Sequence, residues 1–315
     1  MADGERELVR WLQQRTGPSK WPVLLGIGDD MAIVEVGGTV AGAGATALIT
    51  SDMLMDGVHF QTAEHSLEQI GRKAIACSLS DCAAMAVRPV AATVSVAWPA
   101  GGSIEDAKRL FNGMQDMAGQ FDCAIVGGDT TSWKQPLAID VAMIASEYAD
   151  HPPVLRSGAR TGDTLYVTGP LGGSRLGRHM SFVPRVREAR SIAATMGPHL
   201  HAMMDLSDGL SLDLHRMCEA SNVGAELIED LFARVISDDA RRVSEADGVS
   251  PLRHALDDGE DFELLLAVGG DAPEPPAIEA VYLHPVGRVV ADGITLRRHD
   301  GSTQPVEPAG YEHLL

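Results

Sequence analysis

The chain has 315 residues, of which 25 are Lys or Arg and 44 are Asp or Glu, so its formal net charge is −19 at pH 7. This acidic balance argues against binding to nucleic acid or to an anionic membrane surface, since both repel negative charge. The length suggests two domains of roughly 150 residues each, and an apolar fraction of 45% is typical of globular proteins.

The lysines are few, and their positions exclude one class of phosphate-binding site. None of them directly follows a glycine, so a Walker phosphate loop is excluded. The G-x-S-x-G nucleophile motif and the H-E-x-x-H zinc motif are absent as well. Any bound phosphate would therefore depend on metal ions, backbone N–H groups and arginine.

The cysteines and the apolar segments predict a cytoplasmic protein. The cysteines show no C-x-x-C spacing, and residues 1–15 alternate charged and apolar residues, unlike a secretory leader. No apolar run reaches the roughly 20 residues that a membrane-spanning helix needs. We therefore expect reduced, buried thiols and no association with membranes.

Helical and strand-like patterns alternate through the first half of the sequence. An amphipathic pattern predicts a short helix within residues 1–15, and residues 67–85 predict a long helix with Asp81 on its apolar side. Residues 103–121 predict a second amphipathic helix with a capping pair at its start. Strand-like runs are expected at residues 23–28, 46–50, 90–98, 123–126 and 137–145.

Consecutive prolines mark residues 149–153 as a linker, because they fit poorly inside a helix or a strand. We therefore predict an N-terminal domain at residues 1–148 and a C-terminal domain at 154–315. In the second domain a helix is expected after residue 209, extending to about 221. Strands are expected at residues 164–167, 202–204, 225–228 and 262–268, and near Val281 and Ile294. Each half is therefore of α/β or α+β class.

Four of the strand-like runs stop at an aspartate, in the segments Gly26-Ile27-Gly28-Asp29-Asp30, Thr50-Ser51-Asp52, Gly127-Gly128-Asp129 and Asp205-Leu206-Ser207-Asp208. Carboxylates at the carboxyl ends of buried strands tend to gather at one rim of a sheet, where α/β proteins bind ligands. Any single aspartate after a strand is more often a turn residue than a ligand, but four such positions favour a cluster. Clustered carboxylates repel one another unless cations lie between them, and oxygen-only ligands select hard cations such as Mg²⁺.

Small and hydroxyl-bearing residues beside these aspartates favour a phosphate ligand. Glycine lets the backbone approach a ligand closely, and Thr50, Ser51 and Ser207 offer hydroxyls to metal or phosphate. Asp81 adds a carboxylate on the apolar side of a helix, although a capping or exposed role remains open. The residues alone thus predict a site where Mg²⁺ ions hold phosphate groups, and phosphoryl transfer as the reaction.

Seven motifs cover nearly the whole chain. They are Gly26-Ile27-Gly28-Asp29-Asp30, Ser51-Asp52 through Phe60, Leu79-Ser80-Asp81-Cys82-Ala83-Ala84-Met85, Gly127-Gly128-Asp129-Thr130-Thr131, Leu155-Arg156-Ser157-Gly158-Ala159, Asp205-Leu206-Ser207-Asp208-Gly209-Leu210 and Gly259-Glu260-Asp261-Phe262-Glu263-Leu264. In this order they resemble the thiamine-monophosphate kinase family. That family belongs to a superfamily with aminoimidazole ribonucleotide synthetase, selenophosphate synthetase and a hydrogenase-maturation protein.

The resemblance implies ATP-dependent phosphorylation of thiamine monophosphate to thiamine diphosphate, with Mg²⁺, in a homodimer. It also implies an α/β (α+β) fold of two domains, in which the N-terminal sheets of two subunits pair and the C-terminal α/β domain closes the active-site cleft. The segment 175–185 is shorter than is usual in the family.

The resemblance further implies roles for individual residues. The implied metal ligands are Asp30, Thr50, Ser51, Asp52, Asp81, Asp129, Asp205 and Asp208. ATP would be held by Gly128, Asp129, Arg156 and Ser207, and thiamine monophosphate by His59, Glu260 and Tyr311. No residue is expected to act as a general base, because the attacking phosphate of the substrate is already ionised near neutral pH.

Two alternatives to this function remain open at the level of the sequence. The chain could be another ATP-using member of the superfamily, similar to aminoimidazole ribonucleotide synthetase. It could also be a non-catalytic module that binds nucleotide or metal. Arg156, His59, Glu260 and Tyr311 could each have a purely structural role in that case.

Overall fold

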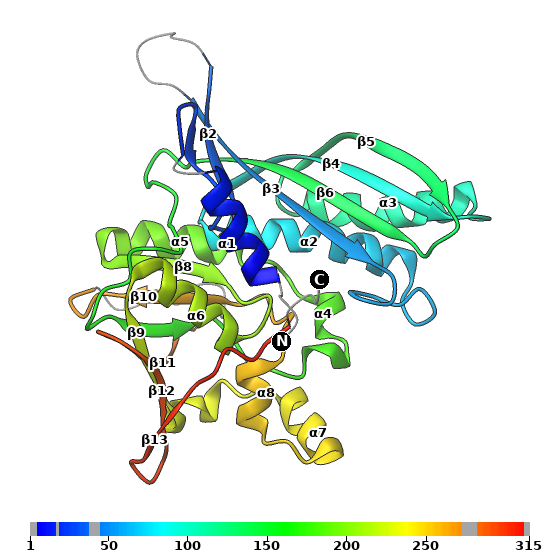
Figure 1. Cartoon of the computed structure of the whole chain (residues 1–315). Coiled ribbons are helices and arrows are strands. Elements are labelled where there is room, and N and C mark those ends of the chain that lie inside the picture. The colour runs from blue at the N-terminus through cyan, green and yellow to red at the C-terminus, as the bar shows by residue number, and fades with distance from the viewer. Residues whose placement is uncertain (1–4, 17–18, 38–44, 273–281, 312–315) are drawn as a thin grey trace.

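The computed structural model describes residues 5–16, 19–37, 45–272 and 282–311 of the chain. Its strands form two sheets, one from the first half of the sequence and one from the second (Figure 1). Helices cover both sheets, so the expected α/β (α+β) class is confirmed. The change from one sheet to the other falls at the predicted linker, while the exact domain limits 1–148 and 154–315 stay a prediction.

The first sheet has six strands in the order β1-β2-β3-β6-β4-β5. Neighbouring strands are antiparallel except β4 and β5, which are parallel and joined by a helix. Strand β5 lies at one edge. The strands are β1 Val23–Leu25, β2 Ala32–Val36, β3 Ala45–Met55, β4 Arg88–Pro99, β5 Ala124–Trp133 and β6 Ala138–Ser146.

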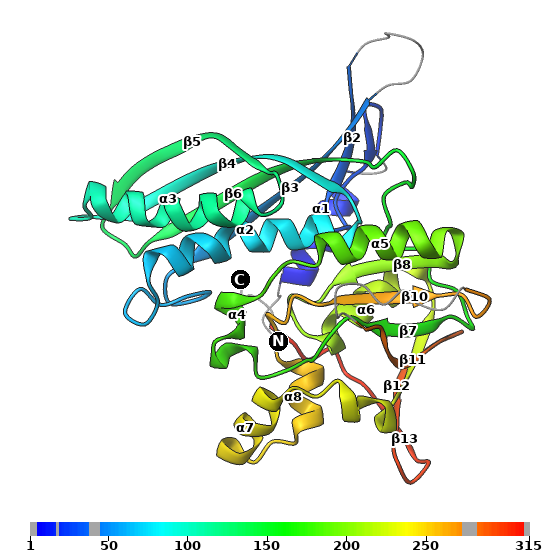
Figure 2. The same cartoon turned by 180° about the vertical axis from the view of Figure 1, so that it is seen from behind.

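Helices α2 (Leu67–Ala84) and α3 (Ile104–Gly119) lie side by side on one face of this sheet (Figure 2). Both begin with a capping box, in which a serine accepts a hydrogen bond from the backbone of the third helical residue. Glycines permit their close contact, since a Cβ atom on Gly71 would lie 2.1 Å from the carbonyl oxygen of Leu110, and one on Gly113 would lie 2.0 Å from that of Glu68.

The second sheet has seven strands in the order β13-β12-β9-β11-β7-β10-β8. Its neighbours are antiparallel except β9 and β12, which are parallel. The strands are β7 Thr164–Val167, β8 Leu200–Asp205, β9 Gly224–Ile228, β10 Leu264–Val268, β11 His284–Val290, β12 Ile294–Arg297 and β13 Thr303–Pro305.

Two apolar cores flank the second sheet. Leu264 and Leu266 of β10 belong to a core shared with α2 and the first sheet, whereas Leu265 and Ala267 belong to a core formed with α6. This split follows from the alternation of side chains along a strand. Helix α2 contacts β3 and β6 on one side and α5 and β8 on the other, so it lies between the two sheets (Figures 1 and 2).

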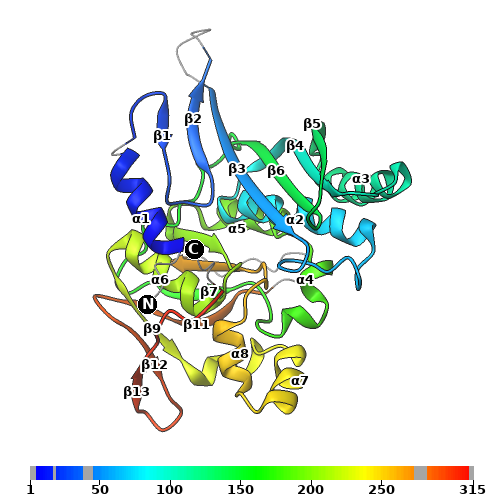
Figure 3. The ribbon, with the colours of Figure 1, turned by 45° about the vertical axis from the view of Figure 1, so that its right-hand side comes forward.

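Of the remaining helices, α1 lies beside α6, and α7 lies beside α8 (Figure 3). Arg10 of α1 donates a hydrogen bond of 2.8 Å to Glu219 of α6. These helices are α1 Glu5–Thr16, α4 Arg178–Ser181, α5 Val186–Met196, α6 Leu210–Ser221, α7 Asp238–Asp247 and α8 Pro251–Asp257. Short 3₁₀ turns occur at Ser174–Leu176, Gly197–His199 and Glu229–Arg234.

Two expectations about the strands are wrong. Strands β3 and β5 do not stop at Asp52 and Asp129 but continue to Met55 and Trp133. Asp52 and Asp129 also do not lie at the rim of a sheet, because both project from within a strand of the first sheet. The strand expected near Val281 cannot be assessed there, since this residue lies outside the described part of the chain.

Candidate functional site: an acidic cluster beside a cavity

Three aspartates from distant parts of the sequence converge between the two sheets. Asp30 lies in the connection between β1 and β2, Asp81 in α2 and Asp205 at the end of β8. One carboxylate oxygen from each lies within 4.8 Å of the other two. The Asp205 residue is 3% exposed and the Asp30 side chain 4% exposed. The convergence predicted from the sequence is therefore present for these three residues.

Burial and mutual repulsion disfavour the ionised forms of these acids. Burial raises the pKa of Asp81 well above its usual range, and the charges of Asp52, Asp205 and Asp30 raise it further. The pKa of Asp205 is raised for the same reasons, burial first and Asp30 second. Burial likewise raises the pKa of Asp52 to about 6, with Asp140 and Asp30 adding to the effect. Such an arrangement of acids favours a cation among them.

The donor set fits a hard divalent cation. Among the described residues, the buried Oδ2 atom of Asp30 has no hydrogen-bond partner, and the grouped ligand atoms are all carboxylate oxygens. Oxygen-only ligands of this kind suit Mg²⁺ or Ca²⁺ rather than Zn²⁺. The chemistry of these acids therefore fits a magnesium ion.

Hydroxyl groups from β3 and α2 hold the carboxylates in place. Thr50 donates a hydrogen bond to Asp81. Ser78 donates one of 2.6 Å to Asp52, and Ser80 donates one of 2.6 Å to Asp205. Ser78 and Ser80 received no role from the sequence, although hydroxyls beside Asp81 in an otherwise apolar helix were a usable signal.

Ser51 and Asp129 lie on the other face of the first sheet. Thr50 and Asp52 point towards α2, so the intervening Ser51 side chain points away from it, and its hydroxyl donates a hydrogen bond of 2.9 Å to Asp140 of β6. Asp129 is exposed on the edge strand β5, beside Gly128. Its register partner Ser95 also pairs with Asp140, which places Asp129 and Asp140 on one face.

The structure thus divides the predicted metal ligands into two groups. Asp30, Thr50, Asp52, Asp81 and Asp205 gather around α2, whereas Ser51 and Asp129 share the opposite face with Asp140. A small cavity of about 180 Å³ lies between Asp129 and Asp140. Asp140, which the sequence did not single out, belongs with the second group.

Arg156 lies directly beside the acidic cluster. Its Nη2 atom donates a hydrogen bond of 2.6 Å to Asp30, and its backbone N–H donates one of 3.1 Å to Asp29. Ser207 and Asp208 follow β8 immediately after the cluster residue Asp205. Asp208 forms an ion pair with Arg216 of α6, which the sequence did not single out.

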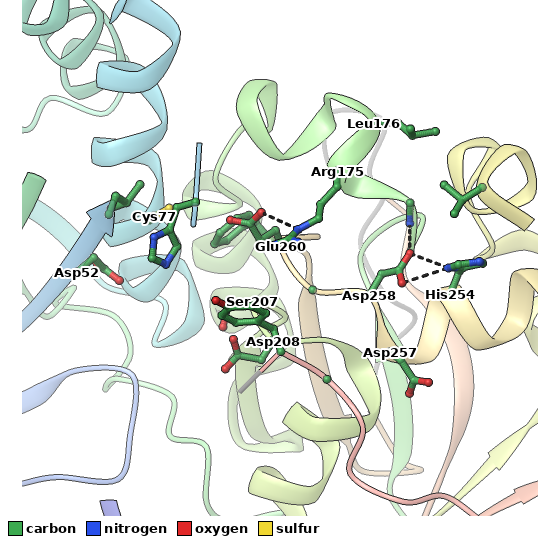
Figure 4. A pocket seen from close by; sticks show the side chains of 18 of the residues that line it. Asp52, Cys77, Arg175, Leu176, Ser207, Asp208, His254, Asp257, Asp258 and Glu260 are labelled. Atoms are coloured by element: carbon green, nitrogen blue, oxygen red, sulfur yellow. Dashed lines mark hydrogen bonds and ion pairs between the residues drawn. The ribbon is translucent and has the colours of Figure 1, made fainter. Parts of the chain in front are cut away.

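A cavity of about 850 Å³ opens next to the cluster, between β3 and α2 on one side and loops of the second sheet on the other (Figure 4). Asp52, Ser207 and Asp208 line it. His59, Glu260 and Tyr311 line the same cavity, although the sequence separates the first from the last by most of the chain. The three residues predicted to contact the substrate are therefore brought together.

Individual contacts fix these three residues. The His59 ring accepts a hydrogen bond of 3.1 Å from the backbone N–H of Met55. Tyr311 donates its backbone N–H to the carbonyl oxygen of Asp208 at 3.0 Å. Arg175 lies 5.6 Å from the centre of the Tyr311 ring and 3.8 Å from Glu260. Arg175 was not predicted to belong to the site. It lines the cavity together with Glu260, and Figure 4 shows the ion pair between them.

Lys73 is a further residue that the sequence analysis missed. Its side chain is completely buried in α2, where it contacts Glu260 and the backbone of His59. A signal was present, because Lys73, Cys77 and Asp81 follow one another at intervals of four residues and so share one side of the helix.

Comparison with known proteins agrees with this arrangement. Residues 28–146 match the family model "AIR synthase related protein, N-terminal domain", and residues 160–293 match the corresponding C-terminal domain model. The chain thus has both domains of an AIR synthase-related protein. The thiamine-monophosphate kinase of Rhodopirellula baltica is 40% identical over 98% of this chain and 97% of its own length. This chain therefore belongs to the thiamine-monophosphate kinase family.

Two further similarities span most of the chain. The thiamine-monophosphate kinase of Mycobacterium tuberculosis (strain H37Rv) is 34% identical over 86% of this chain and 83% of its own. The solved structure described as "AaThiL complexed with AMPPCP and TMP" matches with a TM-score of 0.81 and 26% identity, covering 98% of this chain and 97% of that one.

Two features bear on the expected environment of the protein. All four cysteines are free and buried, as expected. Among the helices that the structure describes, none combines the length and the apolar character that crossing a bilayer requires.

Proposed function

We propose that this protein transfers the terminal phosphoryl group of ATP to thiamine monophosphate, giving ADP and thiamine diphosphate. Membership of the thiamine-monophosphate kinase family supports this activity, as does the similarity to a structure described with AMPPCP and TMP. The observation that carries the proposal is the position of the acidic cluster. Asp30, Asp81 and Asp205 meet close to Asp52, which lines a cavity large enough for a phosphorylated small molecule.

Asp30, Asp52, Asp81 and Asp205 are the residues that would hold Mg²⁺ around α2, with Thr50 assisting. Ser51 and Asp129 would contribute from the other face of the sheet, where Asp140 supplies a further carboxylate. Asp208 would contribute on the nucleotide side. Bound Mg²⁺ would neutralise the charge that ATP and the acceptor phosphate bring together.

The nucleotide would be held by Gly128, Asp129, Arg156 and Ser207. Support comes from Arg156, whose guanidinium lies at the acidic cluster with an Nε atom that has no hydrogen-bond partner among the described residues. A guanidinium can bind two phosphate oxygens at once, which the ammonium group of a lysine cannot do. Arg156 would thus orient the ATP phosphates relative to Asp30.

The acceptor would occupy the large cavity, where its phosphate would face Asp52 and its rings would face His59, Glu260 and Tyr311. The Glu260 carboxylate suits the cationic thiazolium ring and the aminopyrimidine donors, and Tyr311 offers an aromatic surface for stacking. An oxygen of the acceptor phosphate would form the new bond to phosphorus while the bond to ADP breaks. No general base is needed, because that phosphate is already ionised near neutral pH.

The active form of the enzyme would be a cytoplasmic homodimer. Support for a dimer comes from the face of the first sheet opposite α2, where Ile49, Met53, Val126 and Ile144 are large apolar residues with at least 41% of their surface exposed. An apolar area of this kind favours contact with another protein surface. Sedimentation analysis of the wild type and of Val126→Arg tests this, with a shift to monomer expected for the variant.

A coupled assay of ADP release tests the proposed activity. The wild type should release ADP with thiamine monophosphate and Mg²⁺, but not with an aminoimidazole precursor in its place. Release with the precursor alone would instead favour an activity like that of aminoimidazole ribonucleotide synthetase. Release with neither compound would favour the non-catalytic binding module.

A further inference from the structure

One lysine side chain joins the two walls of the large cavity. Lys73 is 0% exposed, and its ammonium group lies 2.5 Å from Oε1 of Glu260 and donates a hydrogen bond of 2.6 Å to the carbonyl oxygen of His59. His59 belongs to the segment between β3 and α2, whereas Glu260 belongs to the loop before β10. A single buried cation therefore sets the spacing between two residues that line the cavity from opposite sheets.

The backbone of Glu260 leaves its side chain little freedom to move. Its φ angle is +63°, in the left-handed region that non-glycine residues rarely adopt. Its N–H donates a hydrogen bond of 2.6 Å to the carbonyl oxygen of Ser207, and its carbonyl accepts one of 2.5 Å from Ser174. With the backbone fixed on both sides, the side-chain contacts determine where the carboxylate points.

The two carboxylate oxygens of Glu260 have different partners. Oε1 is held by the buried Lys73 at 2.5 Å. Oε2 lies 3.8 Å from Arg175, whose side chain is 63% exposed. An exposed pair at this distance contributes little to stability, so a ligand can displace Arg175 from Oε2 more easily than it can displace Lys73 from Oε1.

We infer that Lys73 is a positioning residue for substrate binding: it holds Oε1 of Glu260 so that Oε2 is presented to the cavity. This inference rests on the proposed function, in which Glu260 contacts thiamine monophosphate. Lys73 itself does not touch the substrate, since its side chain is wholly buried. Its loss should therefore weaken binding of the acceptor and leave binding of ATP unchanged.

A purely structural role for the ion pair makes a different prediction. If Lys73 only fastened α2 to the second sheet, its replacement would lower the thermal midpoint without a selective effect on one substrate. A buried carboxylate left without its cation is strongly destabilising, so stability alone does not separate the two roles. The separation requires the KM values of both substrates, measured in variants with and without the Glu260 charge.

The experiment compares Lys73→Met, Glu260→Gln and the double variant with the wild type, using ADP release and the thermal midpoint. Lys108→Met is the matched control, because it makes the same substitution at a lysine of α3 whose side chain is 61% exposed. We expect Lys73→Met to raise the KM for thiamine monophosphate about tenfold or more, the effect of losing one charge-assisted contact. The KM for ATP should stay within about twofold of the wild-type value.

The double variant keeps the test decisive if Lys73→Met fails to fold, because it carries no unpaired Glu260 charge. Its KM for thiamine monophosphate should equal that of Glu260→Gln, since Lys73 acts through the carboxylate. A further tenfold increase in the double variant would overturn the inference, as would an unchanged KM in a folded Lys73→Met protein. A wild type that neither turns over nor binds thiamine monophosphate would overturn the proposed function and, with it, this inference.

Discussion

Arg156 donates a hydrogen bond of 2.6 Å to Asp30, so the segment just after the linker is tied to the acidic cluster. The side chains are 16% and 4% exposed, respectively, which makes this a largely buried ion pair. Removing the guanidinium leaves Asp30 without this cation beside the carboxylates of Asp81 and Asp205. In the absence of Mg²⁺ we expect Arg156→Ala to lower the free energy of unfolding by on the order of 3 kcal/mol, as measured by urea denaturation.

The same variant should also weaken nucleotide binding. We expect its KM for ATP to rise about tenfold, since one charge-assisted contact to phosphate is lost. Arg10→Ala is a suitable control, because Arg10 is exposed and paired with Glu219 of α6. An Arg156→Ala protein with both wild-type stability and wild-type KM would contradict the role proposed for this residue.

Asp81→Asn should raise the stability of the metal-free protein and lower its activity. Three carboxylates lie within 4.8 Å of one another, so removing one charge relieves repulsion in the metal-free protein and should increase the free energy of unfolding by about 1 kcal/mol. The same change removes a proposed Mg²⁺ ligand, so turnover should fall about 100-fold or more. Urea denaturation in EDTA and the ADP-release assay measure the two effects.

The exposed Asp116 of α3 provides the matched control for that experiment. Asp116→Asn makes the same chemical change on the same side of the first sheet but away from the cluster, and should leave both quantities as in the wild type. An Asp81→Asn enzyme with wild-type turnover at any Mg²⁺ concentration would rule out Asp81 as a metal ligand.

His254 should make part of the stability depend on pH. Burial opposes protonation of its ring, but the hydrogen bonds and charges of Asp258 and Asp247 outweigh burial and raise its pKa above the ordinary value of 6.5. The protonated ring binds both carboxylates in the folded state, so this contribution is complete below pH 6.5 and is lost as the pH rises through the raised pKa. Thermal midpoints of the wild type and His254→Gln between pH 5.5 and about pH 9 measure it.

The difference between those two midpoints should be largest at the acidic end and shrink at the alkaline end. A constant difference across the whole range would show that the His254 ion pairs do not contribute to stability. Asp258 also accepts a hydrogen bond of 2.8 Å from the backbone N–H of Gly173. The stability lost when His254 is deprotonated should therefore include part of the stability of the glycine-rich turn at the edge of the cavity.

Gly113 is required where α3 meets α2. A Cβ atom there would lie 2.0 Å from the carbonyl oxygen of Glu68, which belongs to the backbone and cannot move aside. We expect Gly113→Ala to lower the free energy of unfolding by about 1–3 kcal/mol, as measured by urea denaturation. At Gly119, also in α3, an added Cβ meets nothing within 4 Å, so Gly119→Ala should not destabilise the protein. Equal losses in both variants would show that the contact with Glu68 does not decide the effect, because alanine by itself favours a helix more than glycine does.

The sequence predicted most of the elements whose periodicity is strong. The long helix at residues 67–85 and the amphipathic helix at 103–121 correspond closely to α2 and α3. Strands β3 and β5 were predicted too short, because Ser51-Asp52 and Gly127-Gly128-Asp129 have low strand propensity. Pairing with β6 and β4 supplies backbone hydrogen bonds that override this preference. Such pairing joins residues far apart in the chain, so no local pattern reveals it.

The site was predicted in part for a similar reason. The aspartates could be recognised one by one, and those near α2 do converge. Their distribution over two faces of a sheet depends on strand register. Ser51 and Asp129 lie on one face, and Thr50 and Asp52 lie on the other. The contact between Lys73 and Glu260 joins residues 187 positions apart, and neither residue alone indicates its partner.

Helix α2 supplies both the lysine that holds Glu260 and one carboxylate of the acidic cluster. Lys73 and Asp81 are eight residues apart, which corresponds to about 12 Å along a helix axis. A helix is stiff over this length, so α2 would fix the distance between the proposed acceptor contact at Glu260 and the proposed Mg²⁺ ligands. On the proposed function, an acceptor too short to reach both would lose one of the two sets of contacts, so the rigidity of one helix would select acceptors by their length.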